Sequence, residues 1–339
     1  MKLISWNTPR KCHLHCRHCY RDAGETEAGE LSTEEGKKLL GEIAESGFNI
    51  IIFSGGEPLL RDDILELTSH ARGLGLRPVF GTTGTTITRE MARRLKQSGA
   101  VRMGISLDSA GKDFHDELRQ VPGSWHKAVE GMKNCRKEGL EFQVHTTVVE
   151  KNYDEFEQIT DFSVELGAEA HHIFFLVPSG RALNMEREAL RREKYEKLLQ
   201  RILNKQKEVS LELKPTCAPQ FMRITAQKGI TTRFSRGCLA GTAYCCITPN
   251  GDVNPCPYLP VKVGNVLEIP FSRIWREGEV FNRLRNEKLG GKCGECRYLE
   301  TCSGCRARAY YYEEDYMSQD PWCLYEPSTR EGKPVGENR

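Results

Sequence analysis

The sequence lacks a long apolar run, and it lacks an excess of charge of either sign. Its 339 residues include 49 basic and 47 acidic side chains, and the formal net charge of +2 gives no bias toward nucleic acid. No run approaches the roughly 20 apolar residues that span a bilayer, and Met1 leads into a strand-like segment rather than a signal peptide. We therefore expect a cytoplasmic protein with no nucleic-acid or membrane partner.

Cysteine, in contrast, is abundant and unevenly placed. Of the 14 cysteines, three lie near the N-terminus and nine lie from Cys238 onward. Because the cytoplasm keeps thiols reduced, disulfides are not expected there, and ligation of metal or of iron–sulfur clusters is the better interpretation. Cys135 lies in a predicted helix and is interpreted as a buried small hydrophobic residue.

The N-terminal group places Cys12, Cys16 and Cys19 within eight residues. This spacing is too tight for a strand, whose successive side chains point to opposite faces, but a loop can turn all three sulfurs toward one point. Three thiolates would leave one iron of a four-iron cluster without a protein ligand, so that this iron could bind a small molecule. The alternatives are a structural zinc site, which the three interspersed histidines keep open, and a disulfide loop.

From residue 1 to about 214, strand-like apolar runs alternate with amphipathic segments. A capping box at Ser32 and Glu35 starts the first helix, and the all-apolar run 50–53 is typical of a parallel strand buried on both faces. Further helices are predicted at 62–74, 89–97, 124–138, 153–166 and 186–207, and further strands at 78–82, 101–107, 141–149, 170–177 and 209–214. The pattern predicts an α/β fold with helices outside a parallel sheet, either a partial barrel of about six βα units or a doubly wound sheet.

Polar residues follow several of these strands, at the end where parallel-sheet folds gather functional groups. Gly55 and Gly56 would let the backbone approach a ligand closely, and Glu57 could accept a hydrogen bond from a cation there. Ser106 and Asp108 could bind sugar hydroxyls, or Asp108 and Ser109 could cap the next helix.

The sixth strand and the segments after it carry basic side chains. His171 and His172 are adjacent on the strand, so only one of them can face the interior. Arg181 lies just past this strand and Lys214 lies near the last one, where both could bind a carboxylate or phosphate of a substrate, together with a histidine. The alternative is a buried, satisfied histidine and a surface arginine.

The cysteine spacing, the following Tyr20 and the Gly-Gly-Glu-Pro turn together resemble the signature of the radical S-adenosylmethionine (SAM) enzymes. By this resemblance the three N-terminal cysteines are catalytic residues that bind a [4Fe-4S] cluster, whose open iron binds SAM and yields a 5′-deoxyadenosyl radical. The resemblance favours the partial (β/α)6 TIM-like barrel. Relatives often carry Asn where Thr83 stands, so the role of Thr83 is not implied. The SAM-binding residues that the resemblance implies are Tyr20, Gly55, Gly56, Glu57, Pro58, Ser106, Asp108, Thr147 and Asn152.

The C-terminal cysteines resemble the SPASM extension of radical SAM enzymes, which carries two auxiliary [4Fe-4S] clusters. The segment has few apolar runs, and clusters would supply the core that it lacks. Zinc bound by its two Cys-x-x-Cys pairs is the alternative. The ligands implied by position are Cys238, Cys256 and Cys305 for the first cluster and Cys293, Cys296, Cys302 and Cys323 for the second.

Two departures from the SPASM pattern affect this ligand set. The interval between Cys302 and Cys305 is one residue shorter than usual, and the additional ligand of the first cluster is missing from its near position. We favour Cys217 as the replacement over Cys245 or Cys246, although that site could also stay open for a substrate. The expected domains are a radical SAM barrel over 1–214, a SPASM domain over 215–327 and a disordered tail over 328–339.

Several segments narrow the resemblance to the NirJ and alternative haem synthase group. They are 4–8, 20–24, 171–178, 237–241 and 305–309, and the shorter NirJ-like proteins of haem d1 biosynthesis resemble the chain most. The group acts on propionates of sirohaem-derived iron tetrapyrroles, which implies a didecarboxysirohaem-like substrate and a flavodoxin or ferredoxin-type electron donor. One branch removes whole propionates, and another decarboxylates them oxidatively to vinyl groups, with an auxiliary cluster as the expected electron acceptor. The alternatives are a maturase of a peptide substrate and a non-catalytic cluster carrier or zinc-stabilised scaffold.

Overall fold

The computed structural model describes residues 1–26 and 28–327, and it contains one ten-stranded sheet in the order β10-β9-β8-β1-β2-β3-β4-β5-β6-β7. Strands β1 to β8 pair in parallel, while β9 and β10 pair antiparallel at one edge. The strands are β1 Leu3–Asn7, β2 Ile50–Ser54, β3 Arg77–Thr82, β4 Arg102–Ser106, β5 Phe142–Val148, β6 Ala170–Phe175, β7 Glu212–Thr216, β8 Tyr244–Ile247, β9 Asp252–Asn254 and β10 Gly264–Asn265.

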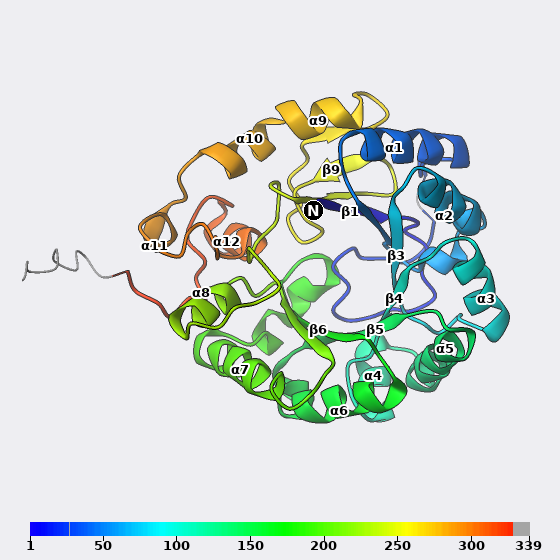
Figure 1. Ribbon diagram of the computed structural model, residues 1–339. Helices are drawn as coiled ribbons and strands as arrows, with labels where there is room; N and C mark the ends of the chain where they lie inside the picture. The colour runs from blue at the N-terminus through cyan, green and yellow to red at the C-terminus, as the bar shows by residue number, and fades with distance from the viewer. Residues whose placement is uncertain (27, 328–339) are drawn as a thin grey trace, which may run out of the picture.

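Helices surround this sheet in a ring (Figure 1). The α-helices are α1 Thr33–Glu45, α2 Ile64–Gly73, α3 Arg89–Gln97, α4 Lys112–Arg119, α5 Ser124–Glu138, α6 Phe156–Leu166, α7 Arg192–Lys205, α8 Gln220–Gln227, α9 Phe271–Glu277, α10 Glu279–Asn286, α11 Gly291–Gly294 and α12 Arg306–Glu313. Three short 3-10 helices are η1 Pro58–Leu60, η2 Glu150–Glu155 and η3 Gly180–Glu188. The predicted α/β fold, with a parallel sheet inside and helices outside, is confirmed.

The sheet curls into a barrel that stays open. Strands β7 and β10 are its two edges, and among the described residues they do not pair with each other. Helices α8, α11 and α12 lie on the side of the ring between these edges (Figure 1). Strands β8 to β10 come from beyond the predicted boundary at residue 214, so the sheet continues across it, and the division into domains stays a prediction.

Some predicted elements have different limits in the structure. The predicted helix 186–207 is two helices, because the chain leaves helical geometry between η3 and α7 to bury Ala189 and Leu190, which are 2% and 1% exposed. The last predicted strand lies a few residues later, as β7. Helix α4 and the helices α8 to α12 were not predicted, because short helices among Gly, Pro and Cys carry little periodic signal.

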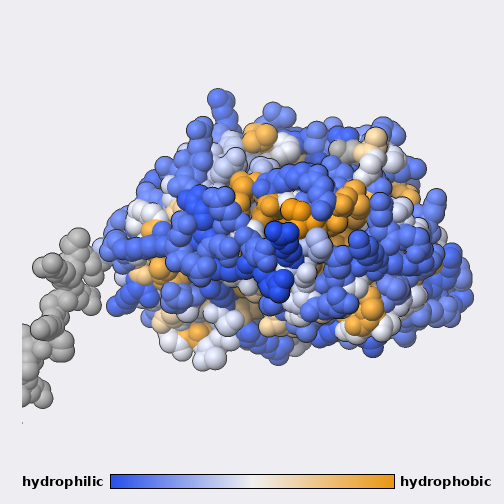
Figure 2. Space-filling model, turned by 90° about the horizontal axis from the view of Figure 1, so that it is seen from above, coloured by the Kyte–Doolittle hydropathy of each residue, from blue (hydrophilic) through white to orange (hydrophobic). Residues whose placement is uncertain are grey.

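The apolar core lies between the sheet and the helices. The capping box of α1 is present, with Ser32 accepting from the Glu35 backbone, and α1 buries Leu39, Leu40 and Ile43 against the sheet. A second core cluster joins β5 to β7 with α6 to α8, and it includes Tyr195 of α7. The face seen in Figure 2 is mostly hydrophilic, with apolar side chains gathered near its middle. Within residues 1–26 and 28–327, no helix has both the length and the apolar character needed to cross a bilayer.

Candidate active site

The cysteine loop after β1 is held against the turn after β2 by direct backbone contacts. The Gly56 amide donates to Pro9 O over 2.7 Å, and the Glu57 amide donates to Lys11 O over 2.8 Å. A Cβ on Gly56 would lie 2.1 Å from Lys11 O, and Gly55 has a φ of +121°. The two glycines are therefore required for the close packing of the two loops.

This loop brings together the three N-terminal thiols. Cys16 is buried, and Cys12 and Cys19 are partly buried. Each sulfur accepts one hydrogen bond. Cys12 Sγ accepts from the Leu14 amide, Cys19 Sγ from the Ala23 amide, and Cys16 Sγ from Arg119 Nη1. Burial raises the pKa of the Cys12 thiol to about 12, so its thiolate needs a cationic partner such as a metal or cluster. An all-sulfur donor set of this kind fits an iron–sulfur cluster.

Glu57 supports the turns around the loop rather than facing open space. Its carboxylate is fully buried and accepts from Thr82 Oγ1, at 2.7 Å, and from both the amide and the hydroxyl of Thr83, at 2.8 and 2.6 Å. Thr83 therefore has a clear partner that the sequence did not reveal. Gly55 and Gly56 line the cavity described below, whereas Glu57 and Pro58 are not among its lining residues, and contact of these two with SAM stays a prediction.

Asp108 and Asn152 are also buried and are not among the residues that line the cavity, so their contacts with SAM stay a prediction. The Asp108 carboxylate accepts from Arg119 Nε over 2.7 Å and from the Thr147 amide over 2.9 Å. Asn152 donates to the carbonyl oxygens of Asp108 and Thr147. Neither Asp108 nor Ser109 caps α4, since that helix has no side-chain cap. Ser106 and Thr147, in contrast, do line the cavity.

Arg119 is a functional candidate that the sequence reasoning missed. Its side chain is 7% exposed, its Nη1 lies 3.7 Å from Cys16 Sγ, and it lines the cavity. Burial alone would lower the pKa of Arg119, but the charges of Asp108 and of the Cys16 thiolate outweigh it and raise the pKa. Only the fold brings the end of α4 next to the cysteine loop, and no local pattern marks this arginine.

The cavity inside the barrel has a volume of about 430 Å³. Its lining extends from the N-terminal cysteine loop, across the ends of the strands, to cysteines of the C-terminal region. Tyr20 lies on its wall, where the hydroxyl donates to Asn7 Oδ1 over 3.2 Å and the ring packs 5.0 Å from the ring of Tyr258. The predicted location of Tyr20, beside the cysteine loop, is thus observed.

The two adjacent histidines of β6 have different environments. His171 is fully buried outside the cavity, and its ring nitrogens pair with the hydroxyls of Thr160 and Thr146. His172 lines the cavity, next to His145 and Gln143 of β5. His171 thus has the environment of the alternative interpretation, a buried and satisfied histidine, while the substrate contact of His172 stays a prediction. His145 and Gln143 are wall residues that were not predicted as substrate contacts.

The two predicted cations are placed differently. Arg181 fastens the cysteine loop, since it donates to the carbonyl oxygens of Cys16 and Ala23 and pairs with Asp22 at 2.9 Å, although it also borders the cavity. Lys214 of β7 lines the cavity, and its Nζ lies 5.2 Å from the ring centroid of Phe234. Burial lowers the pKa of Lys214, although the charge of Glu212, two residues earlier on the same strand, favours the cation. Lys214 is the better placed of the two for an anionic ligand.

The first C-terminal group is Cys217, Cys238, Cys256 and Cys305, which share one end of the cavity wall. Burial raises the pKa of Cys256, and the neighbouring thiols of this group raise it further. Cys245 and Cys246 lie in β8 and do not line the cavity, and Cys246 Sγ accepts from Asn7. The structure thus groups Cys217, rather than either of these, with the other three.

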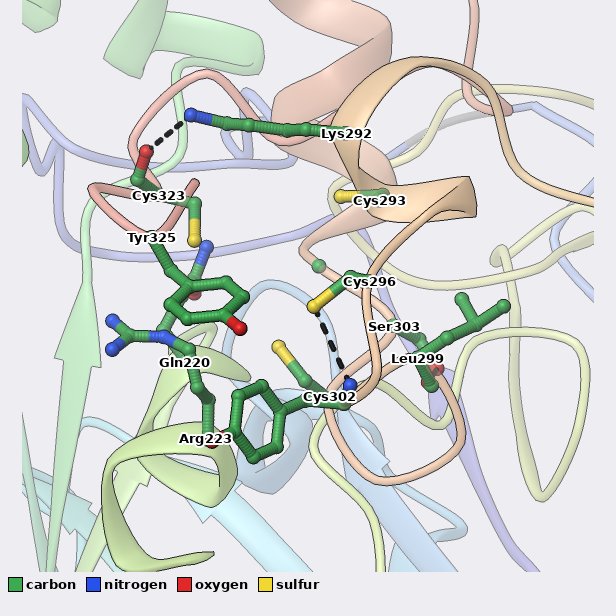
Figure 3. Close-up of a pocket in the computed structure, with 12 residues that line it drawn as sticks. Gln220, Arg223, Lys292, Cys293, Cys296, Leu299, Cys302, Ser303, Cys323 and Tyr325 are labelled. Carbon is green, nitrogen blue, oxygen red and sulfur yellow. Dashed lines mark hydrogen bonds between the residues drawn. The ribbon is translucent and has the colours of Figure 1, made fainter. Parts of the chain in front are cut away.

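The second group is Cys293, Cys296, Cys302 and Cys323, which line a separate small pocket (Figure 3). Lys292 donates to Cys323 O, and the Tyr298 amide donates to Cys296 Sγ. Burial raises the pKa of the Cys302 thiol. Over residues 1–26 and 28–327, no three His, Cys, Asp or Glu side chains surround a point suited to a single metal ion.

A fully buried ion pair connects the two C-terminal groups. Asp320 accepts from Arg308 Nη2 and from the Cys305 amide, each over 2.7 Å, and its own amide donates to Cys293 Sγ. Arg308 Nη1 donates to Cys217 O over 3.1 Å. The two buried charges thus contact the backbone of the first group, and the backbone amide of Asp320 contacts a sulfur of the second.

Comparison with known proteins agrees with these observations. The profile of the radical SAM superfamily matches residues 6–163, and that of SPASM, an iron-sulfur cluster-binding domain, matches residues 238–306. The chain is 40% identical to the AdoMet-dependent heme synthase of Methanosarcina barkeri, over 97% of this chain and 98% of that protein. Identity to the pre-heme d1 synthase of Dinoroseobacter shibae is lower, 28% over 95% and 85% of the two chains.

The fold also resembles solved structures. Streptococcus suis SuiB, in its complex with the precursor peptide SuiA, superposes with a TM-score of 0.76 at 17% identity, over 94% of this chain and 74% of that one. At this level of identity the likeness concerns the fold alone.

Proposed function

Because this chain belongs to the AdoMet-dependent heme synthase family of radical SAM proteins with a SPASM domain, we propose that it modifies propionate side chains of an iron tetrapyrrole. The reaction would remove the propionates or decarboxylate them oxidatively to vinyl groups. The substrate would be a sirohaem-derived ring in a pathway of haem or haem d1 synthesis. One observation carries the proposal: a single cavity is lined by the N-terminal cysteine loop, by the first C-terminal cysteine group and by Lys214.

The buried, all-sulfur donor sets support the proposed cofactors. The three N-terminal thiols would hold the SAM cluster, and the two C-terminal groups would hold the auxiliary clusters. When bound, SAM and these clusters supply a 5′-deoxyadenosyl radical that takes a hydrogen atom from an unactivated carbon, and an acceptor for the electron released with carbon dioxide. Gly55, Gly56, Ser106 and Thr147 on the cavity wall would bind SAM beside Tyr20.

The chain itself would position the substrate and keep water away from it. Lys214 supplies a cation in a mostly apolar cavity, where pairing with a propionate carboxylate is stronger than in water. His172 lies on the same wall, and Arg181 would act mainly by holding the cysteine loop. We infer a cytoplasmic location from the number of free cysteines, and a flavodoxin or ferredoxin-type protein as the electron donor.

The test is anaerobic turnover with SAM, a strong reductant and an iron tetrapyrrole. We expect 5′-deoxyadenosine to form together with carbon dioxide if the propionates are decarboxylated, or together with a three-carbon fragment if they are removed whole. We expect Lys214→Met to weaken tetrapyrrole binding by roughly tenfold, because a buried carboxylate loses its charged partner. Lys207→Met, at an exposed site, is the matched control. SAM cleavage that depends on a peptide, with no change in any tetrapyrrole, would point to a peptide maturase instead.

Iron and sulfide counts test the cofactors separately. After anaerobic reconstitution we expect about twelve irons per chain, falling to about eight when Cys12, Cys16 and Cys19 are all changed to Ala. About eight falling to about four would mean that one auxiliary site does not assemble. Zinc with negligible iron would reject the enzyme and indicate a scaffold.

A further inference from the structure

One wall of the cavity carries two stacked imidazoles held by a single amide. His145 of β5 and His172 of β6 are paired across the sheet, with ring centroids 5.2 Å apart and planes 12° apart. Gln143 Nε2 lies 2.7 Å from His145 Nε2 and 3.3 Å from His172 Nδ1. One side chain therefore fixes the orientation of both rings.

The two rings differ in how closely neighbouring residues cover them. The Nε2 edge of His145 is packed against β4, since a Cβ on Gly104 would lie 2.2 Å from His145 Cε1. Phe174 covers His145 from another side, at 5.1 Å between ring centroids. His172 Nε2, in contrast, has no hydrogen-bond partner within residues 1–26 and 28–327, and His172 lines the cavity. His172 therefore offers a free imidazole nitrogen to whatever occupies the cavity.

The chemistry of this nitrogen differs from that of Lys214. Burial, reinforced by the nearby charge of Lys214, holds the pKa of His172 well below its usual range, and burial lowers the pKa of His145 to about 3. A neutral imidazole adds no positive charge for a carboxylate, but it is a common ligand of haem iron. The wall thus holds a cation for the acidic side chains and a separate neutral donor.

We propose that His172 Nε2 binds the iron of the tetrapyrrole substrate, an inference that rests on the proposed function. A half-turn of the Gln143 amide, whose two ends exchange places at little cost, lets its oxygen accept a hydrogen bond from His172 Nδ1–H, and the lone pair of His172 Nε2 is then free. Metal-bound histidines usually donate their other N–H to such an acceptor. With its iron bound to His172, the tetrapyrrole has its centre fixed at one point of the cavity wall. Lys214, which lies opposite His172 on the neighbouring strand β7, then pairs with the propionates at the edge of the tetrapyrrole.

The experiment compares an iron porphyrin with its metal-free form. Reconstituted protein is titrated anaerobically with ferric coproporphyrin III and, separately, with metal-free coproporphyrin III, which has the same four propionates. Low-temperature electron paramagnetic resonance and Soret difference spectra report the iron ligand. We expect His172→Ala to lose the spectroscopic signal of histidine-bound iron and to bind the iron porphyrin roughly tenfold more weakly. Its affinity for the metal-free porphyrin should equal that of the unchanged protein.

Controls separate the possible failures. If His172→Ala loses the signal because a ligand position of the iron is vacant, added imidazole should restore it. His126→Ala, a change at an exposed histidine, should leave both titrations unchanged. An unchanged iron signal in His172→Ala overturns the inference. Equal losses for the two porphyrins also overturn it and assign His172 to the macrocycle or its carboxylates. If the unchanged protein binds neither porphyrin, the proposed function itself fails.

Discussion

The buried pair of Arg308 and Asp320 should be the most sensitive single point of the C-terminal region. Both side chains are fully buried, and the Arg308 guanidinium also lies 4.3 Å from the ring centroid of Trp322. Burial alone would raise the pKa of Asp320, but the charge and hydrogen bonds of Arg308 outweigh it and lower the pKa to about 2. The aspartate is therefore ionised at neutral pH and compensates the buried arginine.

Asp320→Asn keeps the shape of the side chain but removes this compensation. The amide would turn an NH2 group toward donors, among them Arg308 and the Cys305 amide or the Trp322 amide. Breaking one partner of a buried pair costs about 3 to 5 kcal/mol, because it leaves an unpaired charge in a low-dielectric environment. The pair contacts the backbone of the first cysteine group, and the Asp320 amide contacts Cys293 of the second. We therefore expect lower thermal stability together with the loss of up to about eight irons per chain.

The assay combines thermal unfolding, followed by circular dichroism, with iron counts on the same reconstituted samples. Glu277→Gln is the control, because its pair with Arg273 is exposed and should change stability by at most about 0.5 kcal/mol. The double change Arg308→Met with Asp320→Leu should be less damaging than Asp320→Asn, since it removes both charges. An Asp320→Asn protein with unchanged melting temperature and full iron content would refute this reasoning.

Two further predictions concern backbone contacts of the barrel. Gly56→Ala should release the N-terminal cysteine loop and lose about four irons, because the added Cβ would lie 2.1 Å from Lys11 O, whereas Gly41→Ala meets no atom within 4 Å and should keep them. Asp116→Ala should lower the free energy of unfolding by about 1 to 3 kcal/mol, since its carboxylate accepts two amides and a hydroxyl at the start of α5. The control is Glu130→Gln, whose ion pair with Lys137 lies on the surface and is more than half exposed. Equal melting temperatures for Asp116→Ala and Glu130→Gln would contradict the prediction for Asp116.

Local features could be predicted from the sequence, and features made by distant segments could not. The spacing of Cys12, Cys16 and Cys19 is a local pattern, and so is the alternation of apolar and amphipathic segments that predicts the parallel sheet. The strand period showed that only one of His171 and His172 could face the interior, but the choice depends on how the sheet curves. Arg119 reaches Cys16 across 103 residues of sequence, which no local pattern encodes.

Side chains near a predicted site can also support it through contacts within the protein. Glu57, Asp108 and Asn152 stand at the strand ends where the resemblance places SAM, and in the structure they organise the turns behind the cavity wall. The sequence did not indicate these partners, and the contacts of the three residues with SAM stay a prediction. Partners are set by which loops pack together, and this depends on contacts such as those of Gly56 with the backbone of residues 9–11.

The position of β8 beside β1 has a consequence for biosynthesis. Strand β1 pairs with β2 on one side, but its other neighbour spans residues 244–247, almost two hundred residues further along the chain. At about 5 to 20 residues per second, the ribosome needs roughly 10 to 40 s to deliver that partner after β2 has emerged. During this interval one edge of β1 has no partner strand, and the three cysteines that follow β1 lie next to an incomplete sheet. The N-terminal cysteine loop is made early, but the strand that completes the sheet beside it arrives much later, so we expect cluster insertion into the loop to follow the emergence of β8.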